Sequence, residues 1–381
     1  MTATEPALLV TGMPRTGTSW VGKMLEAGGE VVYVNEPLNP GHPPGHSPGV
    51  LDADVTHQFQ YIDPEDDEAW RRAFGRTLAL RYGFAREVRR NHSAYDLARM
   101  AKYGTTFTLG RWRGKRAMLD DPFAIFCVPW LVRNFGVRAV VLVRDPVSLV
   151  GSYAKMNWKM RFDQLLDQPA LLRDLVGPAV HDLHVAAKET DVVRAAAMMW
   201  RAIYGVVDRN FRDLPGVTIR RYEDLAVSPV EEFHSLYDYL GLRWRRRSEK
   251  TITAATTGRG NDEGSHRWTL RFGMSKTAFR PMDSSAALRA AQERLSPEQI
   301  ETVRHLTRDL TSRFYGPHAS GSSGTGARGA ASVSRPQPPE PKPARLSGPA
   351  SGRAEVSGYQ PADTGKGTFR STEPVSPAPV N

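Results

Sequence analysis

Residues 11–20, TGMPRTGTSW, combine the residue types that hold a phosphate-sized anion between a strand and a helix. The apolar residues 8–10 before them predict a short buried strand, and residues 21–25 after them predict the start of a helix. Gly12 and Gly17 let the backbone turn sharply and bring its N–H groups close to the anion, and the positive end of the helix dipole adds to the attraction. The stretch therefore predicts an anion-binding strand-loop-helix unit.

The side chains of this loop supply further ligands for an anion. Arg15 carries a permanent positive charge, and three hydroxyl donors follow it, from Thr16, Thr18 and Ser19. The glycine spacing is that of a P-loop, but Thr18 stands where ATP- and GTP-dependent enzymes carry the Lys that contacts the β- and γ-phosphates. An ATPase, GTPase or kinase is therefore disfavoured, and a glycine-rich turn that binds nothing remains an alternative.

A second anion-binding element is expected further along the chain. The apolar residues 139–143 predict a buried strand that ends at Arg144, followed by a helix with Asp145 as its N-cap and Pro146 in its first turn. Ser152 then lies two turns into the helix, about 10 Å along its axis, a distance that an Arg side chain and a phosphate can bridge. Taken alone, an Arg-Asp-Pro turn is equally compatible with a simple ion pair.

Glu36 and Tyr222 also follow predicted strands. Glu36 comes after the β-branched residues 31–34, and Pro37 disfavours a helical conformation for it. Tyr222 comes after a predicted strand at 217–221. Because open α/β sheets bind ligands at the carboxyl ends of their strands, we expect the Glu36 carboxylate at the ligand-binding edge. A turn-capping role for the carboxylate is the alternative.

Length and composition predict one folded domain and a tail. From residue 316 onward the 381-residue chain is dominated by Gly, Ser, Ala and Pro and has almost no large apolar residues. We therefore expect residues 316–381 to be a disordered tail. Residues 1–315 are enough for one α/β domain with helical insertions.

The net charge and the cysteine content limit the cellular compartments and the binding partners that we expect for this protein. The single cysteine, Cys127, suits a reducing compartment, and neither a leader nor an apolar run as long as a membrane span is recognisable, so we expect a cytoplasmic protein without a transmembrane segment. A formal charge of +10 favours anionic partners, but nucleic-acid-binding motifs are missing, so nucleic acid is not expected as a partner. The clustered histidines lack the spacing of a metal site.

The loop at 11–20 resembles the 5′-phosphosulfate loop of sulfotransferases that use 3′-phosphoadenosine 5′-phosphosulfate (PAPS). In both, a cation lies within the loop, here Arg15, and an aromatic residue follows, here Trp20. Arg at this place resembles the carbohydrate-modifying and bacterial branch. Arg144 and Ser152 resemble the family's 3′-phosphate-binding element, and Tyr222 with the Glu-Asp-Leu after it resembles a third element. The resemblance covers about residues 5 to 315 and implies a P-loop-like, mostly parallel sheet flanked by helices.

The resemblance implies transfer of a sulfuryl group from PAPS, as co-substrate and without a metal, to a hydroxyl or amine. The acceptor would be a small molecule or glycan: a sugar, a lipid-linked saccharide or a secondary metabolite. Glu36 would take the acceptor's proton, and Arg15 would stabilise charge on the leaving oxygen. Arg144 and Ser152 would hold the 3′-phosphate. The other expected donor ligands are Thr16, Gly17, Thr18, Ser19, Trp20 and Tyr222, the two aromatic residues beside the adenine, with Arg267 from a Gly- and Arg-rich loop.

The chain departs from the family pattern at Asp121. Relatives tend to carry a basic residue just before the Pro at the end of this strand, and cytosolic members carry a catalytic His after it. The departure removes a candidate charge for the sulfuryl group and leaves Glu36 as the base. A nucleotide- or glycan-binding protein without turnover therefore stays as an alternative, beside a P-loop nucleotide kinase or NTPase.

Overall fold

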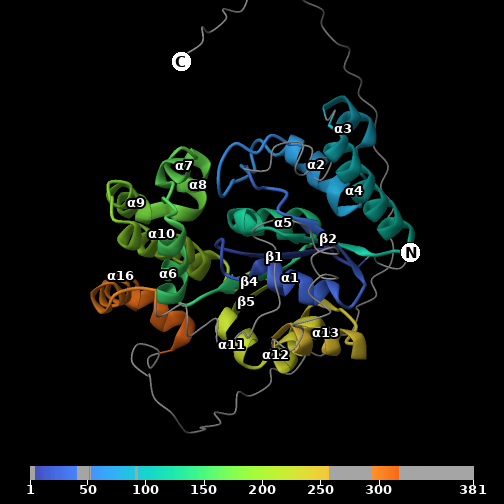
Figure 1. The fold of residues 1–381 in the computed structure, drawn as a ribbon. Coiled ribbons are helices and arrows are strands. Elements are labelled where there is room, and N and C mark those ends of the chain that lie inside the picture. The colour runs from blue at the N-terminus through green and yellow to red at the C-terminus, as the bar shows by residue number, and fades with distance from the viewer. Residues whose placement is uncertain (1–4, 41–50, 52, 91–92, 257–293, 317–381) are drawn as a thin grey trace, which may run out of the picture. The chain divides into compact units, whose positions relative to one another are not determined.

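Five parallel strands form the central sheet of the computed structural model, in the order β2-β3-β1-β4-β5 (Figure 1). The structure describes residues 5–40, 51, 53–90, 93–256 and 294–316. The expected parallel sheet is confirmed, and because the strands are parallel, their carboxyl ends share one edge. The strands are β1 (Leu8–Gly12), β2 (Val31–Asn35), β3 (Arg116–Asp120), β4 (Arg138–Val143) and β5 (Val217–Arg221).

Helices cover both faces of the sheet, which is why its inner strands are continuous apolar runs. Along β1, Leu9 belongs to one hydrophobic core while Leu8 and Val10 belong to the other, because side chains alternate along a strand. The first core includes α5 (Val128–Phe135), α6 (Pro146–Met156) and α10 (Val192–Asn210). The second includes α1 (Thr18–Glu26), α12 (Pro229–Leu240) and α13 (Arg246–Thr256).

The expected helical insertions lie between the strands and after them. Before β3 come α2 (Glu68–Leu78), α3 (Phe84–Arg90) and α4 (Ala94–Trp112), and after β3 comes η1 (Pro122–Cys127). A group of short helices follows α6: α7 (Phe162–Leu166), α8 (Pro169–Leu171), η2 (Leu172–Val176), η3 (Gly177–Ala179) and α9 (Val180–Ala186). The remaining helices are α11 (Tyr222–Val227) and α16 (Pro297–Tyr315).

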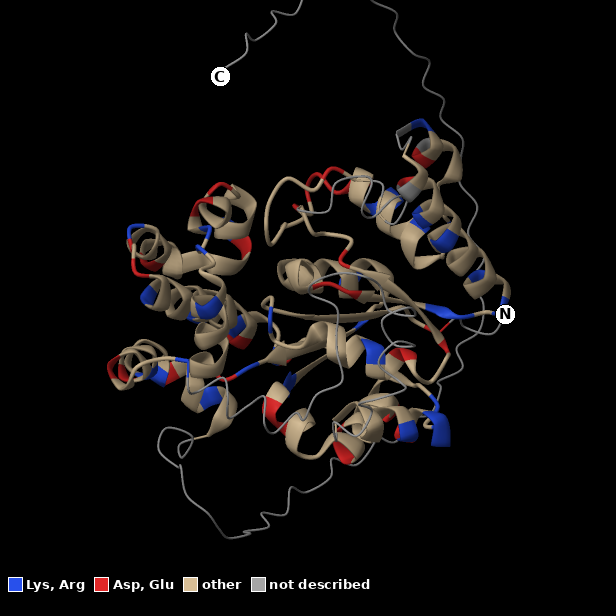
Figure 2. Ribbon diagram, viewed as in Figure 1, with Lys and Arg blue, Asp and Glu red and all other residues tan. Residues whose placement is uncertain are grey.

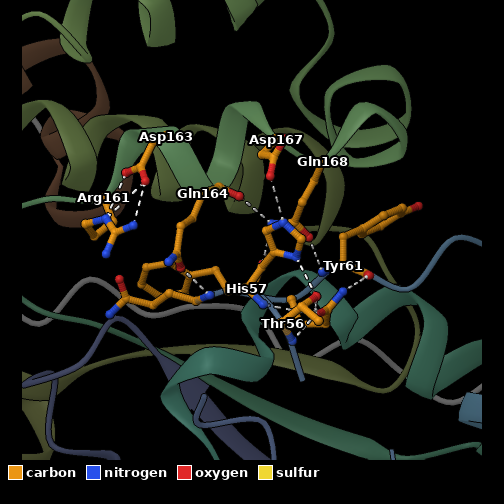
Figure 3. Close-up of polar contacts among 11 residues, drawn as sticks. Thr56, His57, Tyr61, Arg161, Asp163, Gln164, Asp167 and Gln168 are labelled. Atoms are coloured by element: carbon orange, nitrogen blue, oxygen red, sulfur yellow. Dashed lines mark hydrogen bonds and ion pairs between the residues drawn. The ribbon is translucent and has the colours of Figure 1, made fainter. Parts of the chain in front are cut away.

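Part of the segment between β2 and α2 is attached to these short helices (Figure 3). The backbone N–H of Gln58 donates to the Gln164 side chain at 2.6 Å, and the N–H of Tyr61 donates to the Gln168 side chain at 2.8 Å. The amide side chains therefore fix residues 58–61 against α7 and the turn that follows it.

The predicted start of α6 is confirmed. Asp145 caps the helix by accepting from the Ser148 N–H at 2.9 Å, and Pro146 occupies the first turn. Within the described ranges, no helix combines the length and the apolar composition that a bilayer crossing requires. Arg267 and, from residue 317 onward, the expected tail lie outside the described residues.

Candidate active site

The loop between β1 and α1 is a tight turn with two residues in the left-handed region. Arg15 has φ 71° and Gly17 has φ 94°. The turn is closed by Thr16, whose N–H and hydroxyl both donate to the Met13 carbonyl, at 3.1 and 2.6 Å. Gly17 is the N-cap of α1 and has no side chain to cap it, so the first-turn N–H groups remain for an anion.

Two buried tyrosines, Tyr153 of α6 and Tyr204 of α10, hold the backbone of this loop by hydrogen bonds. The Tyr153 hydroxyl donates to the Pro14 carbonyl at 2.8 Å, and the Tyr204 hydroxyl accepts from the Met13 N–H at 3.3 Å. Tyr204 in turn donates to the Leu142 carbonyl of β4 at 2.8 Å, so it joins the loop to a neighbouring strand. Burial raises the pKa of both hydroxyls, which stay protonated and keep these bonds. Sequence reasoning missed both tyrosines as supports of the site.

Arg15, Arg144 and Ser152, predicted from separate motifs, come together. The Arg15 Nε lies 3.3 Å from the Ser152 Oγ, and an Arg144 Nη donates to the Arg15 carbonyl at 2.8 Å. β1 and β4 are paired in the sheet, and this pairing brings the loop beside the end of β4. The two predicted anion-binding elements therefore form one continuous site.

The charges of this site favour an anion. Partial desolvation, followed by the nearby Arg144 guanidinium, lowers the pKa of Arg15, and Arg294 acts in the same direction. The Arg144 Nε is buried without a hydrogen-bond partner among the described residues. Like charges side by side and an unsatisfied donor are both relieved when a phosphate or sulfate group binds between them.

Tyr222 and Trp20 lie beside the loop and touch each other. Their ring centroids are 5.5 Å apart in an edge-to-face contact, and the Arg144 guanidinium lies 4.6 Å from the Tyr222 ring centroid. Trp20 also packs on Phe233, and the two predicted adenine neighbours are only 6% and 8% exposed. The two rings therefore border one side of the site, and most of their surface is packed in the second hydrophobic core, which contains α1 and α12.

The chain just after β4 is held by Glu223. One carboxylate oxygen of Glu223 accepts from the Asp145 N–H at 3.0 Å, and the other accepts from the Tyr315 hydroxyl at 2.8 Å. The Arg144 carbonyl accepts from the Trp200 indole N–H at 2.9 Å. Arg144 is thus fixed by its neighbours on both sides.

Glu36 lies at the carboxyl end of β2, as predicted. Its φ of 43° is in the left-handed region, unusual for a non-glycine residue, and its N–H donates to the Asp120 carbonyl at 2.8 Å. The carboxylate is half-buried and accepts from the Asn39 side chain at 2.6 Å. Burial raises the pKa of Glu36, and the bond from Asn39 opposes this shift. A carboxylate with a raised pKa suits general-base catalysis.

Asp120, not predicted as a site residue, lies between Glu36 and the phosphate loop. It is paired with Val10 of β1 on one side and Asn35 of β2 on the other, and it is completely buried. Burial raises its pKa to about 6, and the Tyr33 hydroxyl, which donates to it, acts against the shift, as do the nearby Ser19 and Thr18 hydroxyls. The loop hydroxyls therefore face a carboxyl group on their inner side.

Asp121, the departure from the family pattern, has a structural role. One of its oxygens accepts from the Leu38 N–H at 2.6 Å and the other from the Phe123 N–H at 2.9 Å, so the side chain caps η1 and holds the chain after Glu36. Burial raises its pKa well above the usual range. The side chain that faces the loop at this strand end is Asp120, because consecutive residues of a strand point to opposite faces.

Gly17 allows the loop to approach Tyr222, and this predicts a large effect for Gly17→Ala. A Cβ at Gly17 would lie 2.7 Å from the Tyr222 ring, and an Ala there would also keep the unfavourable φ of 94°. The matched control is Gly114→Ala, with φ 63° and nothing within 4 Å of the added Cβ. We expect the control to cost about 1 kcal/mol of unfolding free energy and Gly17→Ala clearly more, in thermal and urea melts. Equal losses would contradict the close approach.

Fold and site together define an α/β protein in which a strand-loop-helix unit and a second arginine, from the adjacent strand, come together at the carboxyl edge of a parallel sheet. The chain belongs to the sulfotransferase family, whose family model matches residues 6–246. Membership makes it a sulfotransferase, and the kinase or NTPase alternative is not favoured. No curated protein matches the sequence.

Several solved sulfotransferases have a similar but distant structure. The sulfotransferase domain from the curacin biosynthetic pathway is 15% identical with a TM-score of 0.42, over 80% of this chain and 98% of that one. STF9 from Mycobacterium avium is 16% identical with a TM-score of 0.35, over 82% and 77% of the two chains. The sulfotransferase domain from the Synechococcus PCC 7002 olefin synthase is 12% identical with a TM-score of 0.32, over 75% and 94%. Membership of the family rests on the match to the family model over residues 6–246.

Proposed function

We propose that the protein transfers a sulfuryl group from PAPS to a hydroxyl or amine of a small molecule or glycan. The observation that carries this proposal is the contact of Arg15 with Ser152 and Arg144, which joins a 5′-phosphosulfate loop to a 3′-phosphate element. A nucleotide with phosphates at both ends needs two such sites. PAPS has this arrangement, whereas ATP lacks the 3′-phosphate.

In the proposed reaction the bond between sulfur and the bridging oxygen of the donor breaks as a bond from sulfur to the acceptor atom forms. Arg15 and the first-turn N–H groups of α1 stabilise the charge that develops on the bridging oxygen. The products are the sulfated acceptor and 3′-phosphoadenosine 5′-phosphate. Because the catalytic donors are preorganised by the tyrosines below the loop, little rearrangement is needed during the transfer.

Glu36 accepts the acceptor's proton in this scheme. Its carboxylate lies at the carboxyl edge of the sheet, two strands from the phosphate loop, with Asp120 between. Burial raises its affinity for protons, which strengthens it as a base near neutral pH. Asp120 and Asp121 are completely buried, whereas Glu36 is only half-buried, so of the three carboxyl groups at this edge Glu36 is the one we assign to the acceptor.

The remaining assignments complete the proposal. Trp20 and Tyr222 border the adenine, and Arg267 is assigned to the 3′-phosphate. The acceptor is a sugar, a lipid-linked saccharide or a secondary metabolite, as in the carbohydrate-modifying and bacterial branch, and the reaction takes place in the cytoplasm. The catalytic domain is residues 1–315, followed by a tail.

Calorimetry and a transfer assay test the donor. We expect PAPS to bind and to transfer its sulfuryl group to at least one member of an acceptor panel, with no requirement for Mg²⁺. Binding of ATP with Mg²⁺ but not of PAPS would overturn the proposal. Tight PAPS binding without transfer to any acceptor of the panel would favour a binding protein without turnover.

Arg144→Ala should show how much the 3′-phosphate of the donor contributes to binding, separately from the 5′-phosphosulfate. We expect PAPS affinity to fall about 10- to 100-fold, because one charge-assisted contact to the 3′-phosphate is lost. Affinity for adenosine 5′-phosphosulfate, which has no 3′-phosphate, should change little. The control is Arg308→Ala, an exposed arginine on α16, which should leave both affinities unchanged. Equal losses for the two nucleotides would contradict the assignment of Arg144.

A further inference from the structure

Exposed apolar side chains of the described residues are concentrated on α3 and α4. Five of the eight large exposed ones lie there: Phe84, Val88, Leu97, Leu109 and Trp112. Trp112 is 80% exposed, the highest value among them. Such a concentration of apolar side chains on a face turned to water marks a surface that binds something apolar.

The outer face of α4 is uncharged along its centre, where Leu and Trp side chains occur together with Ala and Thr, and basic at its borders. The exposed positions 97, 101, 105, 108, 109 and 112 follow helical spacing and carry Leu, Ala, Thr, Thr, Leu and Trp. Lys102 and Arg113 border this stripe on one side, and Arg111 borders it on the other. Residues 97–119 contain neither Asp nor Glu. Figure 2 shows the resulting basic bands along α4.

The inner face of α4 makes the contacts that pack this helix on the rest of the protein, so the outer face is not needed for packing. Phe107 and Met100 are buried, and at Gly110 a Cβ would lie 2.2 Å from a Val32 methyl group of β2. The Phe84 ring of α3 rests on Gly104, where a Cβ would lie 2.0 Å from it. The two helices thus form one unit that presents its other side outward.

A cavity of about 410 Å³ lies beside this stripe, between the segment before α3 and α4. Its lining residues include two arginines, Arg81 and Arg111, together with Thr108 and Phe84. The hydroxyl of Tyr82, also in the lining, is buried without a hydrogen-bond partner among the described residues. Cationic and hydroxyl groups next to an aromatic ring suit a phosphate group attached to an apolar chain.

We propose that the outer face of α3 and α4 binds the surface of a membrane that carries anionic phospholipids. Trp112, Leu109 and Leu97 would enter the boundary between headgroups and acyl chains, with Lys102, Arg111 and Arg113 on the phosphates. The cavity at Arg81 and Arg111 would take one headgroup. A second copy of the chain is a poorer occupant, because self-contact would bring the basic borders of two α4 helices together.

Vesicle co-sedimentation of the full chain tests this inference independently of sulfuryl transfer. We expect binding to vesicles of phosphatidylcholine with phosphatidylglycerol, little binding to phosphatidylcholine alone, and weaker binding at high salt. The double variant Leu109→Glu and Trp112→Glu should lose at least tenfold in vesicle affinity. Val185→Glu, at a 51% exposed position on α9, is the matched control and should bind like the wild type.

The single variant Trp112→Glu changes only the most exposed of these side chains and is therefore expected to fold normally. For every variant, the thermal melt and the PAPS affinity should match those of the wild type, which shows that the fold is intact. Failure of the wild-type chain to bind the anionic vesicles would overturn the inference, and so would equal binding by the double variant and the control. A wild-type dimer that the double variant converts to a monomer would assign this face to a second copy instead.

Discussion

Glu36→Gln is expected to lower kcat about 10²- to 10⁴-fold while PAPS affinity stays close to that of the wild type. The substitution keeps the size of the side chain and an acceptor for the Asn39 amide, but it removes the group that takes the acceptor's proton. Steady-state kinetics with an active acceptor, beside calorimetry with PAPS, measure the two quantities separately. Retention of kcat within a few-fold would place the base elsewhere.

The pH dependence gives this assignment a second readout. A base works in its ionised form, so activity is present above the pKa of Glu36 and is lost as pH falls through it. Burial raises this pKa, so the acid limb of the kcat/KM profile should lie above the ordinary value for a glutamate. Asn39→Ala removes a bond that lowers the pKa and should move the limb to higher pH. A limb unmoved by Asn39→Ala would contradict Glu36 as the titrating group.

Arg15→Met is expected to lower kcat about 10²- to 10³-fold, because the variant lacks the positive charge that stabilises negative charge on the leaving oxygen. Met fills a similar volume without a charge, and Arg15→Lys should restore part of the rate. Single-turnover measurements at saturating PAPS separate this effect from weaker binding.

Ser152→Ala is the matched control for Arg15→Met. It removes the Oγ that Arg15 contacts at 3.3 Å but leaves the charge in the loop, so kcat should change little while PAPS affinity falls. A rate for Arg15→Met within a few-fold of the wild type would exclude Arg15 from transition-state stabilisation.

The parts of this site that could be predicted from the sequence are local. The glycines around Arg15 set a turn over a few residues, and Asp145 with Pro146 begins a helix at a predictable place, so loop and helix start were both expected. Because parallel strands align their carboxyl ends, the meeting of Arg15 with Arg144 could be expected in outline once both were placed at strand ends.

The parts that could not be predicted depend on contacts between residues far apart in the chain. Tyr153 and Tyr204 support the loop across 139 and 191 residues, and from their helical periodicity they resemble any buried aromatic residue. The facing of Asp120 toward the loop, rather than Asp121, depends on strand register, since one step along a strand turns the side chain to the other face. Periodicity alone does not define that register.

Tyr315 joins the last described helix to the donor pocket through Glu223, which also holds the start of α6. The end of α16 is thereby linked by hydrogen bonds to the residue that follows Arg144, which we assign to the 3′-phosphate. A version of the protein cut short before Tyr315 would leave the Glu223 carboxylate without this phenol, while a cut after Gly316 would retain it. A chain shortened for crystallisation should therefore keep Tyr315, because this single phenol completes the hydrogen bonds of the Glu223 carboxylate.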